Sequence, residues 1–177
     1  MTHCNSILEL KQKAFRMGIC DRYRKEWEQV TNRKELADMM LSIQGADFVC
    51  ASVAGGWGVT KETMMLTLFD FANGNYIRKR DGYETELYMG ADNRRVDVRS
   101  TLYIVLFSDN MEIYVPKGKA VNIYVAGCRN VDVTCDGVAY IVNYGDCNIN
   151  VLKGNREDVQ VVKPSVIKSS WMFKKEK

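Results

Sequence analysis

The arginines and lysines of this chain are grouped in a way that suggests binding chemistry. Two basic runs lie close together in the sequence and comprise Arg78, Lys79, Arg80, Arg94, Arg95 and Arg99. Guanidinium groups contact phosphates and nearby tyrosines stack on bases, so the runs are candidates for binding RNA or another partner. Acidic residues such as Asp81, Glu84 and Asp97 interleave them, and a solvated face of mixed charge is the alternative interpretation.

Residues that would support catalysis or metal binding are few. His3 is the only histidine, which leaves no Ser-His-Asp or Cys-His set and no two-histidine metal site within one chain. The six cysteines contain no CxxC pair, which argues against structural zinc. The nucleotide-binding patterns GxxxxGK[ST] and strand-linked GxGxxG are missing as well. We therefore expect a protein that is not an enzyme and that holds no metal or cofactor.

Two weaker motifs each have a structural and a chemical interpretation. The segment Gly55-Gly56-Trp57-Gly58 is either a turn or a loop that binds an anion through its backbone N–H groups. The carboxylate pairs Asp132/Asp136 and Glu84/Glu86 are either ordinary surface groups or the acid pair that glycoside hydrolysis needs. In both cases the structural interpretation is favoured.

Length and composition indicate one domain or two small ones. The 177 residues are 46% hydrophobic and 27% charged, a balance that forms a core without metal or disulfide. Twenty-five basic against 22 acidic residues give a net charge of +3 that is spread evenly, so a nucleic-acid role would rest on local patches. Apolar runs are too short for a signal peptide or a membrane span, which predicts a cytoplasmic protein with reduced thiols.

Residues 1–85 are expected to be helical. Apolar residues recur at intervals of three and four in stretches near 6–18, 21–30 and 32–45. Asn32 and Glu35 have capping-box spacing at the start of the third stretch, and Gly45 is predicted to end it. A fourth helix is predicted to start at Thr60 and to run through Phe69.

Residues 86–165 contain a repeat of 18 residues. Its columns are Val105, Ile123 and Ile141; Ile113, Val131 and Ile149; and Val115, Val133 and Val151. Turn residues fall at equivalent places between the two strands of each unit. Cys128 and Cys147 come close in this register, which suggests small side chains in tight corners rather than a redox pair.

The parity of the repeat predicts the architecture. Because residues two apart share one face of a strand, the apolar columns point inward together. The first strand of each unit is apolar on both faces, so its outer face needs a cover. We predict an α+β fold of N-terminal helices packed on a short β-solenoid of about three rungs, with Leu87/Met89 and Val159/Val161 in ragged extra rungs. An antiparallel β-sandwich or meander with helices is the alternative, and residues 166–177 form a basic and aromatic tail of the same compact domain.

Aromatic residues form a candidate protein interface. Tyr124, Tyr140 and Tyr144 fall on the first strands of the repeat, where their outer face is either core or contact surface. Trp171 and Phe173 lie in the tail, which is expected to cap the open end of the solenoid or to dock on a partner.

Two segments resemble small uncharacterised proteins of phages and mobile elements of Bacteroidetes. One is Met17-Gly18-Ile19-Cys20 followed by Trp27, and the other runs from Asn122-Ile123-Tyr124-Val125 to its echo at Tyr140–Gly145. The resemblance implies a helical N-terminus, C-terminal β-repeats and a role as an accessory protein in a bacterial host. It implies no site residues.

The sequence therefore predicts a non-catalytic accessory protein that binds a macromolecular partner. One form of this hypothesis is an inhibitor of a bacterial defence nuclease of the CRISPR type, bound to the nuclease in the bacterial cytoplasm. The alternatives are a self-assembling, virion-associated structural protein and an RNA-binding protein that uses the arginine patches. A protein partner is favoured, RNA and homo-oligomerisation remain alternatives, and no membrane partner is expected.

Overall fold

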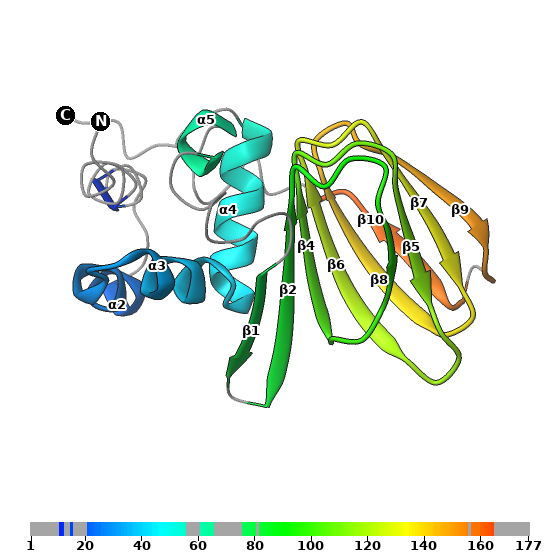
Figure 1. Cartoon of the computed structure of the whole chain (residues 1–177), viewed down its shortest axis with the longest axis horizontal. Coiled ribbons are helices and arrows are strands. Elements are labelled where there is room, and N and C mark those ends of the chain that lie inside the picture. Colours follow the sequence, from blue (N-terminus) through cyan, green and yellow to red (C-terminus); the bar gives the residue numbers. More distant parts are fainter. Residues whose placement is uncertain are drawn as a thin grey trace. The chain divides into compact units, whose positions relative to one another are not determined.

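A computed structural model describes residues 11–12, 15, 21–55, 61–65, 76–80, 82–155 and 157–164. The chain forms two compact units, Met1–Phe71 with Ser165–Lys177, and Ala72–Pro164 (Figure 1). The β-region begins earlier than the predicted boundary at residue 85, because β1 (Tyr76–Arg80) and β2 (Tyr83–Met89) already belong to the second unit.

The first unit contains helices whose starts follow from local capping. They are α2 (Asp21–Gln29), α3 (Arg33–Met40), α4 (Ile43–Gly55) and α5 (Lys61–Met64). The side chain of Asn32 accepts a hydrogen bond of 3.0 Å from the Glu35 backbone N–H, and the Glu35 carboxylate accepts one of 2.7 Å from the N–H of Thr31. These bonds satisfy N–H groups at the start of α3, so the predicted cap is confirmed.

Gly45 was predicted to end the third helix, and that prediction is wrong. α3 ends at Met40, and α4 runs through Gly45. Ser42 starts the new helix, because its hydroxyl accepts a hydrogen bond of 3.1 Å from the Gly45 N–H. A Cβ atom at position 45 would overlap the carbonyl oxygen of Met39, so the glycine permits a close backbone approach rather than a helix end.

The second unit is a parallel β-solenoid, as predicted, and it has about four turns where about three rungs and ragged extra ones were expected (Figure 1). Sheet A has the strand order β1-β2-β4-β6-β8-β10, and sheet B has the order β3-β5-β7-β9. The remaining strands are β3 (Arg95–Asp97), β4 (Leu102–Leu106), β5 (Met111–Val115), β6 (Ala120–Ala126), β7 (Asn130–Cys135), β8 (Val138–Tyr144), β9 (Asn148–Lys153) and β10 (Val159–Val162). All pairs among the described strands are parallel except β1 with β2, which rules out the antiparallel sandwich or meander.

The coils vary in length around the predicted repeat. One inward column connects Glu86, Tyr103, Ile123, Ile141 and Val161, so successive coils span 17, 20, 18 and 20 residues.

All three predicted columns are corrected by two residues at their first member: Val105 pairs with Val125, Ile113 with Val133, and Val115 with Cys135. The turn at residues 116–119 is two residues longer than its successor at 136–137. An insertion of two leaves the strand parity unchanged, so the inward face is still the predicted one.

Stacked corners hold the coils in register. Gly90, Phe107, Gly127 and Gly145 each follow a strand of sheet A and have φ values of 65°, 52°, 67° and 94°. A second corner is a ladder of asparagines, in which the side-chain amides of Asn110, Asn130 and Asn148 each donate to the asparagine of the preceding coil, at 3.2–3.3 Å. Asn130 and Asn148 are also register partners in the pairing of β7 with β9.

The interior is a single apolar column of valine, isoleucine and cysteine side chains between the two sheets. The outer face of sheet A is also apolar, and its residues Leu87, Ile104 and Leu106 are each about 1% exposed. Burial on both faces agrees with the sequence pattern of these strands. Cover by the N-terminal helices stays a prediction.

The first coil differs from the predicted rung. Tyr88 pairs with Val105 and joins the interior cluster with Val96 and Val98, whereas Leu87 and Met89 face outward. Both faces of β2 carry large side chains, so hydropathy alone did not distinguish its parity.

Candidate functional site

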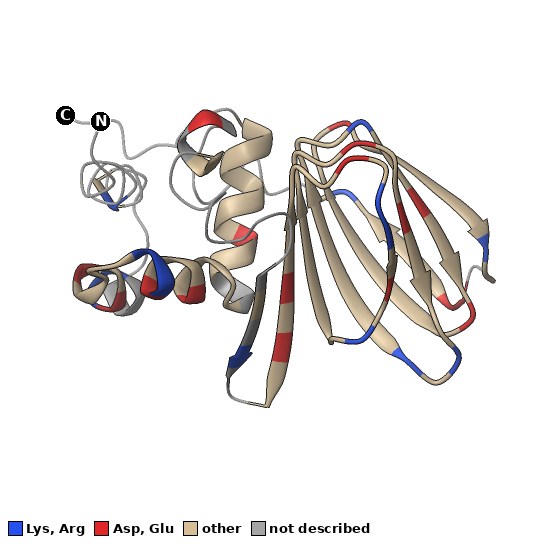
Figure 2. Cartoon of the chain, in the orientation of Figure 1, with Lys and Arg blue, Asp and Glu red and all other residues tan. Residues whose placement is uncertain are grey.

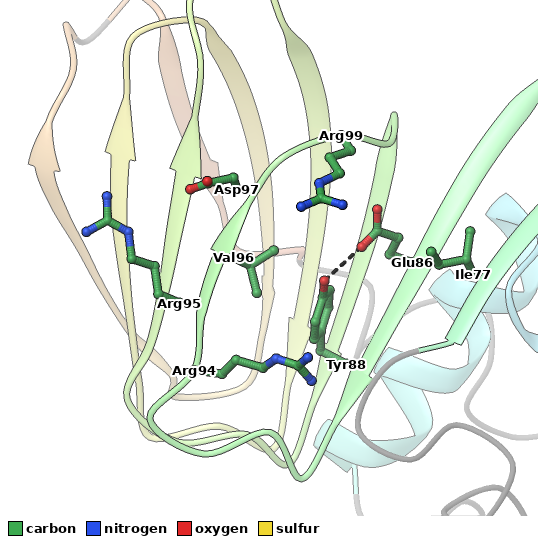
Figure 3. A pocket seen from close by; sticks show the side chains of 8 residues that line it. All are labelled: Ile77, Glu86, Tyr88, Arg94, Arg95, Val96, Asp97 and Arg99. Carbon is green, nitrogen blue, oxygen red and sulfur yellow. Dashed lines mark hydrogen bonds between the residues drawn. The ribbon is translucent and has the colours of Figure 1, made fainter.

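A pocket of about 410 Å³ opens at the first coil of the solenoid (Figure 3). Its lining comes from β1, β2, β3 and the residues on either side of β3, and comprises Ile77, Glu86, Tyr88, Arg94, Arg95, Val96, Asp97 and Arg99. Among the described strands, β3 is the edge of sheet B, and β1 extends sheet A beyond the first coil. The pocket therefore occupies the end of the solenoid that no further coil covers.

The floor of the pocket is a hydroxyl network around one buried carboxylate. Glu86 is 4% exposed, and its Oε1 accepts hydrogen bonds from the hydroxyls of Ser100 at 2.6 Å and Tyr103 at 2.9 Å. Its Oε2 accepts a bond of 2.8 Å from Tyr88 (Figure 3). Three donors on two oxygens satisfy this buried group without a cation, as a buried carboxylate requires.

The Tyr103 hydroxyl connects this network to the backbone. It accepts hydrogen bonds from the backbone N–H groups of Arg99 at 2.8 Å and Ser100 at 3.2 Å while it donates to Glu86. The segment that carries Arg99 is thus held against the buried carboxylate, so that the network positions this arginine at the pocket.

Tyr88 lies between another ring and a cation. Its ring stacks on Tyr103 with a centroid distance of 6.0 Å and an interplanar angle of 6°, and the Arg94 guanidinium lies 5.5 Å from its centroid. Burial raises the pKa of both tyrosines, so their hydroxyls stay protonated as donors to Glu86 at neutral pH. The Tyr88 ring therefore already has an aromatic and a cationic neighbour.

The three arginines of the pocket differ in their surroundings. Arg95 lies 3.9 Å from the Glu112 carboxylate on the outside of sheet B, and both side chains are exposed. Figure 3 shows Arg94 reaching toward Tyr88 and Arg99 lying beside Glu86, while Arg95 extends away from both. Within the described part of the chain, neither Arg94 nor Arg99 makes an ion pair within 4.0 Å. These two guanidinium groups are available to an anion.

The first predicted basic run is close by but contributes little to the pocket. Residues 78–80 lie on β1, whose Ile77 lines the pocket. Lys79 forms an exposed ion pair of 2.6 Å with Glu84, which raises the pKa of the lysine and lowers that of the glutamate. The side chains of Arg78 and Arg80 lie outside what the structure describes. The structure therefore brings together Arg94, Arg95 and Arg99 from the predicted six.

The tyrosines of the predicted aromatic interface differ in how far they are buried. Tyr124 and Tyr144 stack on the outer face of sheet A at a centroid distance of 6.1 Å, and Tyr144 is 2% exposed. Tyr140 is 40% exposed. Tyr144 therefore has a core role, and Tyr140 remains a candidate contact residue. Trp171 and Phe173 lie outside the described residues.

Glu86 and Tyr88 are the site residues that sequence reasoning missed. Glu84 and Glu86 were considered as a facing acid pair, but they lie two apart on the same strand, and Glu84 pairs with Lys79 instead. The available signal was the alternation Glu84-Thr85-Glu86-Leu87-Tyr88, which places a carboxylate and a phenol on one face. In the other predicted carboxylate pair, Asp132/Asp136, the Asp136 carboxylate forms an ion pair of 2.6 Å with Lys153. This ion pair lowers the pKa of Asp136.

The corner cysteines are buried free thiols. Cys128 and Cys147 are 7% and 5% exposed, and burial raises the pKa of their thiols to about 12 and about 11. A protonated thiol is a poor nucleophile, so the structural interpretation of these residues holds. The described residues include no group of three His, Cys, Asp or Glu side chains that could hold a metal ion. His3 and Gly56-Trp57-Gly58 lie outside the described ranges.

Comparison with protein-family models, with curated proteins and with solved structures finds no match to this chain. In the part of the chain that the structure describes, no single helix is long and apolar enough to cross a bilayer; α3 with residues 45–55 would reach the required length and composition only as a bent pair.

Proposed function

We propose that this protein is a non-catalytic binding protein that holds a macromolecular partner by an anionic group seated in the pocket of Arg94 and Arg99. One observation carries the proposal: two guanidinium groups without an ion pair among the described residues line a pocket whose own buried carboxylate already accepts three hydrogen bonds. Arginine binds carboxylate and phosphate oxygens through paired N–H groups, so these side chains fit an oxyanion.

The arrangement favours binding over acid-base catalysis. A general acid or base needs an oxygen that reaches the substrate, and both oxygens of Glu86 accept hydrogen bonds from hydroxyls of this chain. The only other carboxylate of the lining, Asp97, lies on the outer side of β3 with Arg95 (Figure 3). The pocket can hold an anion and offer an acceptor at its rim.

The charge pattern supports recognition of a discrete group. Figure 2 shows basic and acidic residues interspersed along the described ribbon of the solenoid. Non-specific nucleic-acid binders contact many phosphates along a continuous basic band. An acidic side chain of a partner protein therefore fits better than a length of nucleic acid. RNA is the second candidate, because the basic run at residues 78–80 lies on the strand beside the pocket.

The resemblance to phage proteins implies a bacterial host. In that setting, the partner we propose is a bacterial defence nuclease. An inhibitor of this size would act by occupying a surface of the nuclease. The partner's identity is what the experiment has to supply.

The test is an affinity pull-down from a bacterial lysate, with and without RNase, that compares the wild-type chain with Arg94→Ala/Arg99→Ala. Arg129→Ala is the matched control, because Arg129 is equally exposed but lies on another turn, beside Asp109 at 3.4 Å. We expect one protein partner that survives RNase, is retained by Arg129→Ala and binds the double variant about 100-fold more weakly. A partner lost on RNase treatment would favour the RNA alternative, and equal capture by the double variant would refute the pocket.

A further inference from the structure

At the opposite end of the solenoid, sheet A ends in an edge strand whose outer side no other described strand pairs with. β10 pairs in parallel with β8 and is the last strand of sheet A. Among the described strands it has no second neighbour. On its far side the Val159 N–H donates to the Asn155 carbonyl at 3.0 Å, whereas the N–H of Val161 and the C=O groups of Val159 and Val161 face outward. An edge of this kind accepts another strand through backbone hydrogen bonds.

An inward-facing side chain is exposed at this edge. Val161 continues the interior column, since it pairs with Ile141, which is 0% exposed. Val161 itself is 43% exposed, whereas Val159 at the other inward position of β10 is 9% exposed. Solenoids need their terminal coil covered, because each coil buries its apolar face against the next. The exposed valine therefore marks a surface whose burial would be favourable.

The charges before and after β10 have opposite signs, so the edges of two copies are complementary when their β10 strands run antiparallel. Glu157 and Asp158 precede the strand, and Lys163 follows it. In an antiparallel pair of two copies, the acidic start of one strand meets the basic end of the other. With Gln160 on the two-fold axis, Val159 lies opposite Val161 of the second copy, and Glu157 lies opposite its Lys163. A parallel pair would place like charges together instead.

The neighbouring edge of sheet B also exposes an inward valine, since Val151 pairs with the buried Val133 and is 40% exposed, but this edge has features that oppose pairing. The pairing of β9 with β7 shifts between Val133 and Thr134, so the strand is irregular there. Lys153 at its end is engaged with Asp136 at 2.6 Å. Bulges and charged side chains are the features by which proteins keep edges from pairing. β9 therefore carries an irregularity and an engaged charge, whereas the four residues of β10 are uncharged and pair with β8 without a register shift.

We propose that β10 is a homodimer interface, in which two copies of this chain join their A sheets by antiparallel pairing about a two-fold axis. Such an isologous contact is closed, so it yields a dimer and no filament. It extends sheet A across the two copies and covers the exposed Val161. The proposal is independent of the arginine pocket, which lies at the other end of the sheet.

The first test measures the mass of the full-length chain in solution by sedimentation velocity. The expected mass is twice the 20.2 kDa of one chain, and Val161→Asp is expected to return it to the monomer value. Val138→Asp is the control, because Val138 is 50% exposed and lies on β8, one strand in from the edge strand. A monomeric wild-type chain, or a dimer that Val161→Asp leaves intact, would overturn the proposal.

A charge-exchange experiment tests the orientation of the two strands. Lys163→Glu places acid against acid and Glu157→Lys places base against base, so each variant alone is expected to dimerise at least about tenfold more weakly at low salt. Mixing the two variants restores both pairs and is expected to give a heterodimer. Lys117→Glu, an exposed change on the turn before β6, should leave dimerisation unchanged. Failure of the mixture to associate while the wild type dimerises would rule out the antiparallel arrangement.

Discussion

Replacement of Glu86 tests whether the hydroxyl network holds the first coil together. The carboxylate is 4% exposed and accepts hydrogen bonds from Tyr88, Ser100 and Tyr103 at 2.6–2.9 Å. Glu86→Ala leaves all three hydroxyls without this acceptor and creates a cavity. Glu86→Gln keeps an oxygen and replaces the other with an amide, so Ser100 and Tyr103 can keep their acceptor.

The expected magnitude follows from the number of bonds lost. A hydrogen bond to a charged group contributes roughly 1.5–3 kcal/mol, but three such bonds on one carboxylate are not additive. Water that enters the pocket satisfies part of the freed groups. We therefore expect Glu86→Ala to lower the free energy of unfolding by about 3 kcal/mol and Glu86→Gln by about 1 kcal/mol.

The assay is urea unfolding followed by two probes. The three tryptophans are Trp27, Trp57 and Trp171, so none lies in the solenoid unit of residues 72–164. Tryptophan fluorescence therefore reports the other unit, whereas far-UV circular dichroism reports helices and strands together, and the part of the dichroism change without a fluorescence counterpart is assigned to the solenoid. The urea concentration at the midpoint of the dichroism transition is expected to fall for both variants, and to fall further for Glu86→Ala than for Glu86→Gln.

A double-mutant cycle isolates the bond between Glu86 and Tyr88. Tyr88→Phe removes one hydroxyl and keeps the ring that stacks on Tyr103. If the bond stabilises the coil, Tyr88→Phe costs about 1 kcal/mol less in the Glu86→Ala background than in the wild type. The reasoning is refuted if Glu86→Ala costs less than about 0.5 kcal/mol, or if glutamine is as damaging as alanine.

Two further predictions concern the corners of the coils. Gly137→Ala should destabilise the solenoid by several kcal/mol, because the new Cβ would overlap the carbonyl oxygens of Pro116 and Lys119. Gly118→Ala, at φ 78° with open space around it, should cost only about 1 kcal/mol in the same urea experiment, and equal effects would contradict this account. Cys128 has a thiol pKa raised by burial from 9.0 to about 12, so the unfolded state releases a proton first as pH rises through this window. Stability should fall there by up to about 1.4 kcal/mol per pH unit through this thiol, and chemical denaturation of Cys128→Ala should show a shallower slope.

The repeat was predictable because apolar residues occupy alternate positions of the strands and keep the same parity in successive coils. Ile113, Val131 and Val133 alternate with polar residues, and such a pattern specifies which face of a strand is buried. The length of each coil was not predictable to the residue, because turns tolerate insertions without a hydropathy signal. The longer turn at residues 116–119 shifted the pairing of Val105 by two for this reason.

The candidate site was only half predictable. Arg94, Arg95 and Arg99 stand out as charges, and charge is read directly from the sequence. Glu86 gains its role from tertiary contacts with Ser100 and Tyr103, which lie 14 and 17 residues away and come close only once the coil has closed. Strand β2 is large and apolar on one face and aromatic and acidic on the other, so a simple count of apolar residues assigned the interior to the wrong face.

The two ends of the solenoid suggest different tasks, and their geometry constrains how those tasks combine. β1 and β10 are the outermost of six strands in sheet A, so a dimer through β10 aligns twelve strands. At a strand spacing of about 4.8 Å, the two β1 strands, and with them the two arginine pockets, lie roughly 50 Å apart. A single small anionic partner cannot reach both pockets. The dimer would therefore bind two partner molecules independently, or gain avidity only from a partner whose acidic groups repeat over that distance.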